Sequence, residues 1–231
     1  ISLDFELRWG MHDRLGTDFA AYRENLEGER EVVPALLRLF SDRKIRATWA
    51  CVGAIGCGGW EEYFRRAPSP PEYRDARHAV NPRYAELDPE GNLHFAPDLL
   101  QLVKATPGQQ LGTHTFSHIL VRDPGVTAKD VAADLEAACK LWTERFGGPP
   151  RSLVFPRDQA AFLDVVSAGW VGVKPGCSTR TQSDTRTSTP WAPSSANFPK
   201  SVTLPSMGLW SNLKSPVWTI VPTGECTATS T

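Results

Sequence analysis

Two histidines four residues apart are the first candidates for chemistry in this sequence. His114 and His118 belong to the segment Gly-Thr-His-Thr-Phe-Ser-His, which runs from residue 112 to 118. If this segment forms a helical turn, both imidazoles lie on one face. Two neutral imidazoles and a carboxylate make an open site for a divalent metal, with positions left for water and substrate. The spacing alone favours capping or surface roles for the histidines over metal binding.

Two acidic residues near the start of the chain could complete such a site. Asp4 and Glu6 are two positions apart, so a continuing strand would point both side chains to the same side. One carboxylate could bind the metal while the other accepts a proton from an activated water. Arg157 could orient Asp4 through a charge-assisted pair. A solvated strand end and a surface ion pair are the alternative interpretations of these residues.

Each of these polar clusters follows a strand-like run of residues. Ile-Ser-Leu precedes Asp4, Gln-Leu-Gly-Thr precedes His114, and Ser-Leu-Val-Phe precedes the segment that contains Arg157. In parallel α/β barrels the chemistry gathers at the carboxyl ends of the strands. We therefore expect the three clusters to converge at one mouth of the fold.

Strand and helix patterns alternate along the first three quarters of the chain, which predicts a parallel α/β sheet or barrel. The clearest helix begins after Thr127, with Asp130 placed to form a capping box. Pro34 should fall in the first turns of its helix, where proline is tolerated. A proline-rich loop excursion is expected at 67–97. The expected strands are 1–5, 47–52, 110–113 and 152–155, and the other expected helices are 29–43, 98–104 and 158–168.

Composition excludes several classes of function. The net charge of −1 provides no basic track for nucleic acid, and no apolar run is long enough to span a membrane. The five cysteines form no paired CxxC pattern, which favours a reducing compartment, and hence the cytoplasm, over a disulfide framework. The chain opens on Ile1 inside a strand-like run, so we expect residues upstream to be missing.

The last part of the chain differs from the rest. We divide the sequence into an α/β domain at 1–173 and a tail at 174–231, rich in Ser, Thr and Pro, where helical periodicity disappears. Such a segment should be irregular and poorly ordered. Our preferred hypothesis is that the tail is out of frame relative to an ancestral gene. A β-rich tail and a Ser/Thr-rich linker are the alternatives.

Four segments, taken in order, resemble one known family. They are Asp-Phe-Glu at 4–6, Ala-Thr-Trp-Ala-Cys-Val-Gly at 47–53, His-Thr-Phe-Ser-His at 114–118 and Phe-Pro-Arg at 155–157. Together they resemble the polysaccharide deacetylase (NodB-homology) family over roughly residues 1–173. The resemblance implies a distorted, incomplete (β/α) barrel that removes N-acetyl groups from a carbohydrate.

The resemblance also implies roles for single residues. Asp4 matches the catalytic base, and His114 and His118 match two ligands of a divalent metal, usually zinc. The second acid of the family's first motif would fall on Phe5, which cannot bind a metal. Glu6 is the natural substitute, as in the branch of the family that spaces its two acids by one residue.

Other parts of the family pattern match less directly. Arg157 resembles the arginine of the third motif, although here proline precedes the arginine instead of following it. The family's general acid is typically a late histidine, and no histidine follows His118 in this sequence. The other histidines, His12, His78 and His94, all come earlier. The metal-binding half of the site is therefore expected to be present and the acid half to be absent.

Three functions remain open at this stage. The first is an active carbohydrate deacetylase, in which Trp9 could stack on a sugar ring, with plain packing as the alternative role for Trp9. The second is a related amidohydrolase that acts on a small amide. The third is an inactive fragment that retains metal or sugar binding.

Overall fold

The fold is built on a parallel sheet whose strands follow the order of the chain. The computed structural model describes residues 1–169, 217–220 and 226–229. The first four strands pair in sequence order, each parallel to the next, so the chain is an α/β protein as predicted. The described strands form an open sheet. These strands are β1 (Ser2–Phe5), β2 (Ala47–Cys51), β3 (Gln109–Thr113) and β4 (Ser152–Leu153).

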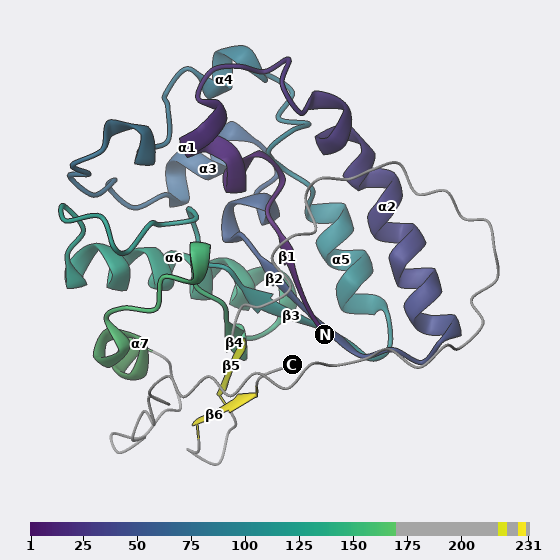
Figure 1. Ribbon diagram of the computed structural model, residues 1–231. Coiled ribbons are helices and arrows are strands. Elements are labelled where there is room, and N and C mark those ends of the chain that lie inside the picture. Colours follow the sequence, from purple (N-terminus) through teal and green to yellow (C-terminus); the bar gives the residue numbers. More distant parts are fainter. Residues whose placement is uncertain (170–216, 221–225, 230–231) are drawn as a thin grey trace, which may run out of the picture.

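Three longer helices connect these strands. They are α2 (Arg23–Asp42), α5 (Pro97–Ala105) and α6 (Ala128–Phe146). Figure 1 shows α2 and α5 side by side, and α1 and α3 near the end of the sheet to which β1 runs. The shorter elements are α1 (His12–Leu15), α3 (Trp60–Arg66), α4 (Tyr84–Leu87), α7 (Leu163–Gly169), η1 (Leu7–Met11), η2 (Gly53–Gly56), η3 (Ala76–His78) and η4 (Pro156–Asp158).

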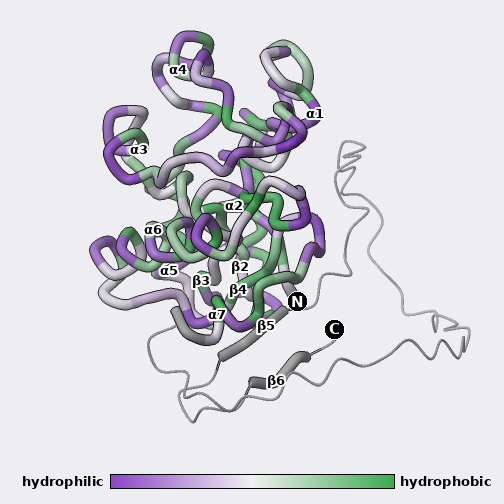
Figure 2. The backbone as a smooth tube through the Cα atoms, turned by 90° about the vertical axis from the view of Figure 1, so that its left-hand side faces the viewer, coloured by the Kyte–Doolittle hydropathy of each residue, from purple (hydrophilic) through white to green (hydrophobic). Residues whose placement is uncertain are grey.

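The two faces of the sheet have different compositions. Leu3, Trp49 and Leu111 are register neighbours, and they share one hydrophobic core with apolar residues of α2, α5 and α6. Figure 2 shows this hydrophobic centre, with hydrophilic stretches on the outer helices. Because side chains alternate along a strand, the following residues face the other side. They are Asp4, Ala50 and Gly112, an acid followed by two small residues.

Helix α6 forms as the sequence predicts. The side chain of Thr127 accepts a hydrogen bond from the backbone N–H of Asp130, whose carboxylate accepts one from the N–H of Thr127 at 2.8 Å. This capping box satisfies donors that the first turn cannot pair internally. Gly147 ends the helix in the left-handed conformation, with φ of 80°.

Helix α2 departs from the prediction. It begins at Arg23 instead of Glu29, so Pro34 lies well inside the helix and not in its first turns. Proline lacks the N–H that would bond one turn back. The helix is nevertheless retained because Val33, Leu37 and Phe40 are buried against the sheet. Burial of this apolar stripe outweighs the local cost of the proline.

Little of the tail lies within the described residues. Its two described segments are β5 (Val217–Ile220) and β6 (Cys226–Thr229), which extend the sheet from β4 as antiparallel strands. These strands were not predicted individually. The rest of the expected irregular tail lies outside the described residues, and the out-of-frame hypothesis stays a prediction. No helix in the described part of the chain is both long and apolar enough to cross a bilayer.

Candidate metal centre

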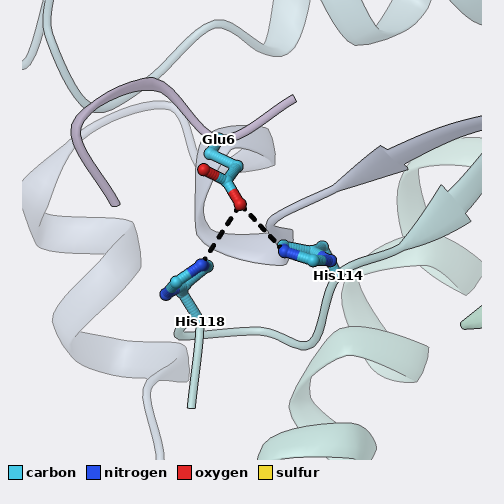
Figure 3. A group of neighbouring side chains, drawn as sticks. All are labelled: Glu6, His114 and His118. Carbon is cyan, nitrogen blue, oxygen red and sulfur yellow. Dashed lines mark hydrogen bonds and ion pairs between the residues drawn. The ribbon is translucent and has the colours of Figure 1, made fainter. Parts of the chain in front are cut away.

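The ends of two strands bring together one acid and two histidines. Glu6 directly follows β1, and Leu7 turns the chain sharply with φ of 48°. His114 directly follows β3, and His118 lies in the loop beyond it. Figure 3 shows the carboxylate of Glu6 between the two imidazoles. The predicted convergence of the first two clusters is therefore confirmed.

The three side chains meet at ligand distance. Oε1 of Glu6 lies 2.9 Å from Nε2 of His114 and 3.2 Å from Nε2 of His118. One ligand atom from each residue can be chosen so that all lie within 4.8 Å of one another. Both histidines are buried, whereas the Glu6 side chain is 24% exposed. Solvent therefore reaches the cluster from the side of Glu6.

The ring nitrogens of His114 have distinct roles. Nδ1 lies 2.9 Å from the carbonyl oxygen of Val154, the residue directly after β4, and can only donate a hydrogen bond to it. This bond leaves Nε2 as the nitrogen with a lone pair. Nε2 is buried and has no hydrogen bond of good geometry among the described residues, despite its closeness to Glu6. A carbonyl that fixes the tautomer in this way is a common partner of metal-binding histidines.

These residues fit a zinc-type ion. With Zn–N and Zn–O distances of about 2.0–2.1 Å, ligand atoms around a tetrahedral ion lie roughly 3.3 Å apart. The two distances from Glu6 in this structure, 2.9 and 3.2 Å, are close to that value. Two imidazole nitrogens and one carboxylate leave further positions for water and substrate.

The electrostatics of the cluster favour an ionised Glu6 and a neutral His118. Burial opposes ionisation of Glu6, but the two histidines outweigh it and hold the pKa of Glu6 well below its usual value. Burial lowers the pKa of His118 to about 4, against the opposing effect of Glu6. Burial lowers the pKa of His114, but the close contact with Glu6, its negative charge and that of Asp4 outweigh burial, and the pKa is raised. At neutral pH His118 is therefore ready to bind a metal.

The segment between the histidines is a loop and not the helical turn that would have placed both imidazoles on one face. Thr115 and His118 both have positive φ, 65° and 57°, which is incompatible with a helix. Asp134, on α6, holds the loop instead. Its carboxylate accepts hydrogen bonds from the N–H of Phe116 at 2.6 Å and of Ser117 at 3.1 Å, and from the Ser117 hydroxyl. Asp134 was not among the predicted site residues, although an acid beside Leu135 in an apolar helical stripe was a usable signal.

Arg157 contacts a different partner from the one predicted. Its Nη2 lies 2.6 Å from Oδ1 of Asp13 and 2.9 Å from the carbonyl oxygen of Gly10, and no bond to Asp4 is present among the described residues. Gly10 in turn makes room for Glu6, since a β-carbon built on Gly10 would lie 1.8 Å from Oε2 of Glu6. The physical reason for the difference is that Gly10, in η1, and Asp13, in the following helix α1, both lie within reach of the guanidinium. Arg157 therefore acts on the backbone beside Glu6.

Asp4 lies next to the cluster but outside the group of three. It sits in β1 on the face of the sheet away from the helices, and its side chain retains access to solvent. The pKa of Asp4 is raised, mainly because neighbouring protein atoms displace part of the water around its carboxylate. The charge of His114 opposes this rise, and the charges of Glu6 and Asp158 add to it. A solvent-accessible carboxylate with a raised pKa, close to His114 and Glu6, suits a proton acceptor.

The Trp9 side chain is not accessible to a sugar in this structure. It is fully buried, and its indole N–H donates to the carbonyl of His94 at 2.7 Å. Tyr63 and Phe95 pack against it with ring centroids 4.9 and 6.0 Å away. The expected substrate role is therefore wrong, and the packing alternative is correct, because η1 turns the indole into the core.

A second carboxyl near Glu6 was also missed. Glu29 lies on α2 and is half-buried. Burial and, to a lesser extent, the negative charge of Glu6 raise the pKa of Glu29 to about 8, against the opposing effect of a hydrogen bond from the N–H of Leu7. Glu29 is therefore protonated at neutral pH. No local sequence signal separated it from the exposed acids of the same helix.

The other three histidines are engaged elsewhere. Nδ1 of His78 lies 2.8 Å from Asp123, and Nδ1 of His94 lies 2.7 Å from Asp88. His12 is buried between two carbonyl oxygens, at 2.7 and 2.9 Å from its ring nitrogens. Its ring centroid is 5.9 Å from that of His118. None of the three occupies the place of a free, solvent-facing proton donor.

Comparisons with known proteins add no family assignment. Neither the models of known protein families nor the curated proteins give a match to this sequence.

Proposed function

We propose that this protein is a metal-dependent hydrolase that removes N-acetyl groups from a carbohydrate. The observation that supports the proposal best is the convergence of Glu6, His114 and His118, within 4.8 Å, beside the carboxylate of Asp4. The open parallel sheet is compatible with the distorted, incomplete barrel that the family resemblance implies. Zinc is the ion that this donor set suits best.

Each residue has a defined task in this proposal. Glu6, His114 and His118 would hold the ion, which when bound polarises a carbonyl and makes water a better nucleophile at neutral pH. Asp4 would take the proton from the attacking water, since it is accessible and close to the cluster. Arg157 would support Glu6 indirectly, because it bonds to Asp13 and to the backbone of Gly10, which lies against the Glu6 carboxylate.

A second candidate is a protein that binds metal without turnover. The observation that favours it is that the three other histidines are already bonded within the protein; these are His12, His78 and His94. A leaving amine needs a proton from some donor before it departs. With no free histidine for this step, the chain could retain the metal and lack the reaction.

One experiment separates the two candidates. Acetate release from N-acetylated oligosaccharides is measured with and without added zinc, beside the zinc content of the purified protein. The hydrolase predicts zinc-dependent acetate release that His114→Ala and Asp4→Asn both abolish, with only His114→Ala losing zinc. Bound zinc without acetate release would favour the second candidate. Activity that survives His114→Ala would defeat the metal mechanism.

A further inference from the structure

A separate cavity of about 250 Å³ lies under the proline-rich loop excursion. Its lining comes from α3, from the segment 67–82 and from α6, together with Ser117 and Ile119 of the histidine loop. Asp4, Glu6, His114 and His118 do not contribute to this lining. The cavity is therefore distinct from the metal centre, although Ser117 stands next to His118. Its volume is below that of sites for drug-sized ligands, which begin at about 300 Å³, and suits a ligand about the size of one sugar ring.

Aromatic rings form much of the cavity wall. Trp60, Tyr63, Phe64 and Tyr73 all line it, and four prolines add further apolar surface. Phe64 is 56% exposed, and its ring stacks on that of Trp60 with the ring centroids 5.9 Å apart. Aromatic faces carry partial negative charge and attract cations as well as apolar ring surfaces.

The charges of the cavity have one sign. Asp130 and Asp134 line it, and no lysine or arginine does so among the described residues. His78, the basic side chain in the lining, is already paired with Asp123 at 2.8 Å. Asp134 is buried and bonded to the histidine loop, so it contributes its charge at a distance. Asp130 uses Oδ2 for the helix cap, and Oδ1 accepts no hydrogen bond from the described residues.

We propose that this cavity binds a small organic cation, an ammonium group carried on an uncharged ring. Aromatic walls would hold the ring, and the carboxylate of Asp130 would meet the ammonium at the edge. The described lining holds no lysine or arginine, and its histidine, His78, is already paired with Asp123, which disfavours an anion. The two carboxylates distinguish the cavity from a site for a neutral apolar ligand. The inference rests on the proposed function in one respect, since removal of an acetyl group would leave such an amino sugar.

The test compares three sugars that differ at one position. Binding of D-glucosamine, D-glucose and N-acetyl-D-glucosamine is measured by NMR shift perturbation at a mildly acidic pH, where glucosamine carries its ammonium. Glucosamine should bind the most tightly. Asp130→Asn keeps an oxygen for the helix cap but removes the charge, and should weaken glucosamine binding about threefold to fivefold. Phe64→Ala should weaken binding by a similar factor.

A matched control lies on the same helix. Glu136→Gln removes an equal charge from an exposed site outside the cavity lining, where Glu136 pairs with Lys140, and should leave glucosamine binding unchanged. Equal binding of glucose and glucosamine, or no effect of Asp130→Asn, would overturn the proposal. His114→Ala should abolish acetate release and leave glucosamine binding intact. The two functions can therefore fail separately, because one is measured by acetate and the other by binding.

Discussion

The carboxylate of Asp134 accepts a 2.6 Å hydrogen bond from the backbone N–H of Phe116, halfway between the two histidines. Asp134 is buried in α6, and burial raises its pKa while the hydrogen bonds from Ser117 and Phe116 lower it. These bonds hold a loop that no regular backbone pattern supports. The loop in turn fixes the direction of the His118 ring.

Replacing Asp134 should therefore damage both the fold and the metal centre. In Asp134→Asn one carboxylate oxygen becomes an NH₂ group, which donates hydrogen bonds and cannot accept them. The loop N–H groups that bonded to that oxygen would then be buried without an acceptor. We expect a loss of about 2–3 kcal/mol in the free energy of unfolding, and about tenfold or more in zinc affinity. Urea unfolding and zinc titration measure the two effects. Glu136→Gln, an exposed change on the same helix, should alter neither, and an equal loss there would refute the assignment.

Gly10 should be essential for the position of Glu6. A β-carbon on Gly10 would lie 1.8 Å from Oε2 of Glu6, so Gly10→Ala must displace the carboxylate. We expect zinc affinity to fall at least tenfold with the circular dichroism spectrum retained. Gly28→Ala is the matched control, since a β-carbon there meets nothing within 4 Å in the middle of α2. That change should stabilise the protein by roughly 0.5–1 kcal/mol.

The new partner of Arg157 can be tested by a double-mutant cycle. Arg157→Ala and Asp13→Ala should show a coupling energy of about 1 kcal/mol, because the pair is at 2.6 Å and mostly shielded from solvent. Chemical denaturation of the four proteins gives this value. Arg157→Ala and Asp4→Asn should be additive. Strong coupling of Arg157 to Asp4 instead would restore the interpretation based on the sequence.

Glu29 should make stability depend on pH. Its pKa is raised to about 8, so between the pKa of an unfolded carboxyl and about 8 the unfolded chain has released a proton that the folded chain keeps. The free energy of unfolding must then fall as the pH rises through this window. Glu29→Gln should flatten that fall, so that the variant is more stable than the parent protein at pH above 8 and similar to it near pH 4. Thermal unfolding across pH measures this, with exposed Glu31→Gln as the variant that should keep the parent profile.

Local patterns predicted the framework of the molecule well. The strand and helix alternation and the capping box of Thr127 are confirmed, since each depends on neighbours a few residues apart. The meeting of Glu6 with His114 and His118 was also foreseen, because strand ends in a parallel sheet share one edge.

What the sequence could not predict depends on distant partners. The loop conformation of His118 requires the hydrogen bonds that Asp134 accepts. Arg157 meets Asp13 because the chain turns at Leu7, and this turn cannot be read from the sequence. Trp9 is buried because rings from α3 and from the loop before α5 surround it. These contacts join residues far apart in the sequence and produce no periodic pattern, so residue types and their local spacing cannot predict them.

The position of β1 in the sheet means that a bound metal would also affect the stability of the amino-terminal strand. Among the described strands, β1 stands at the edge of the sheet and pairs only with β2, while Glu6, which follows it, reaches His118 across 112 residues of chain. An ion held by both would act as a reversible cross-link that closes a very long loop, and long loops gain the most from closure. Chelation should therefore loosen the amino-terminal strand first, as faster amide hydrogen exchange in β1 than in β3.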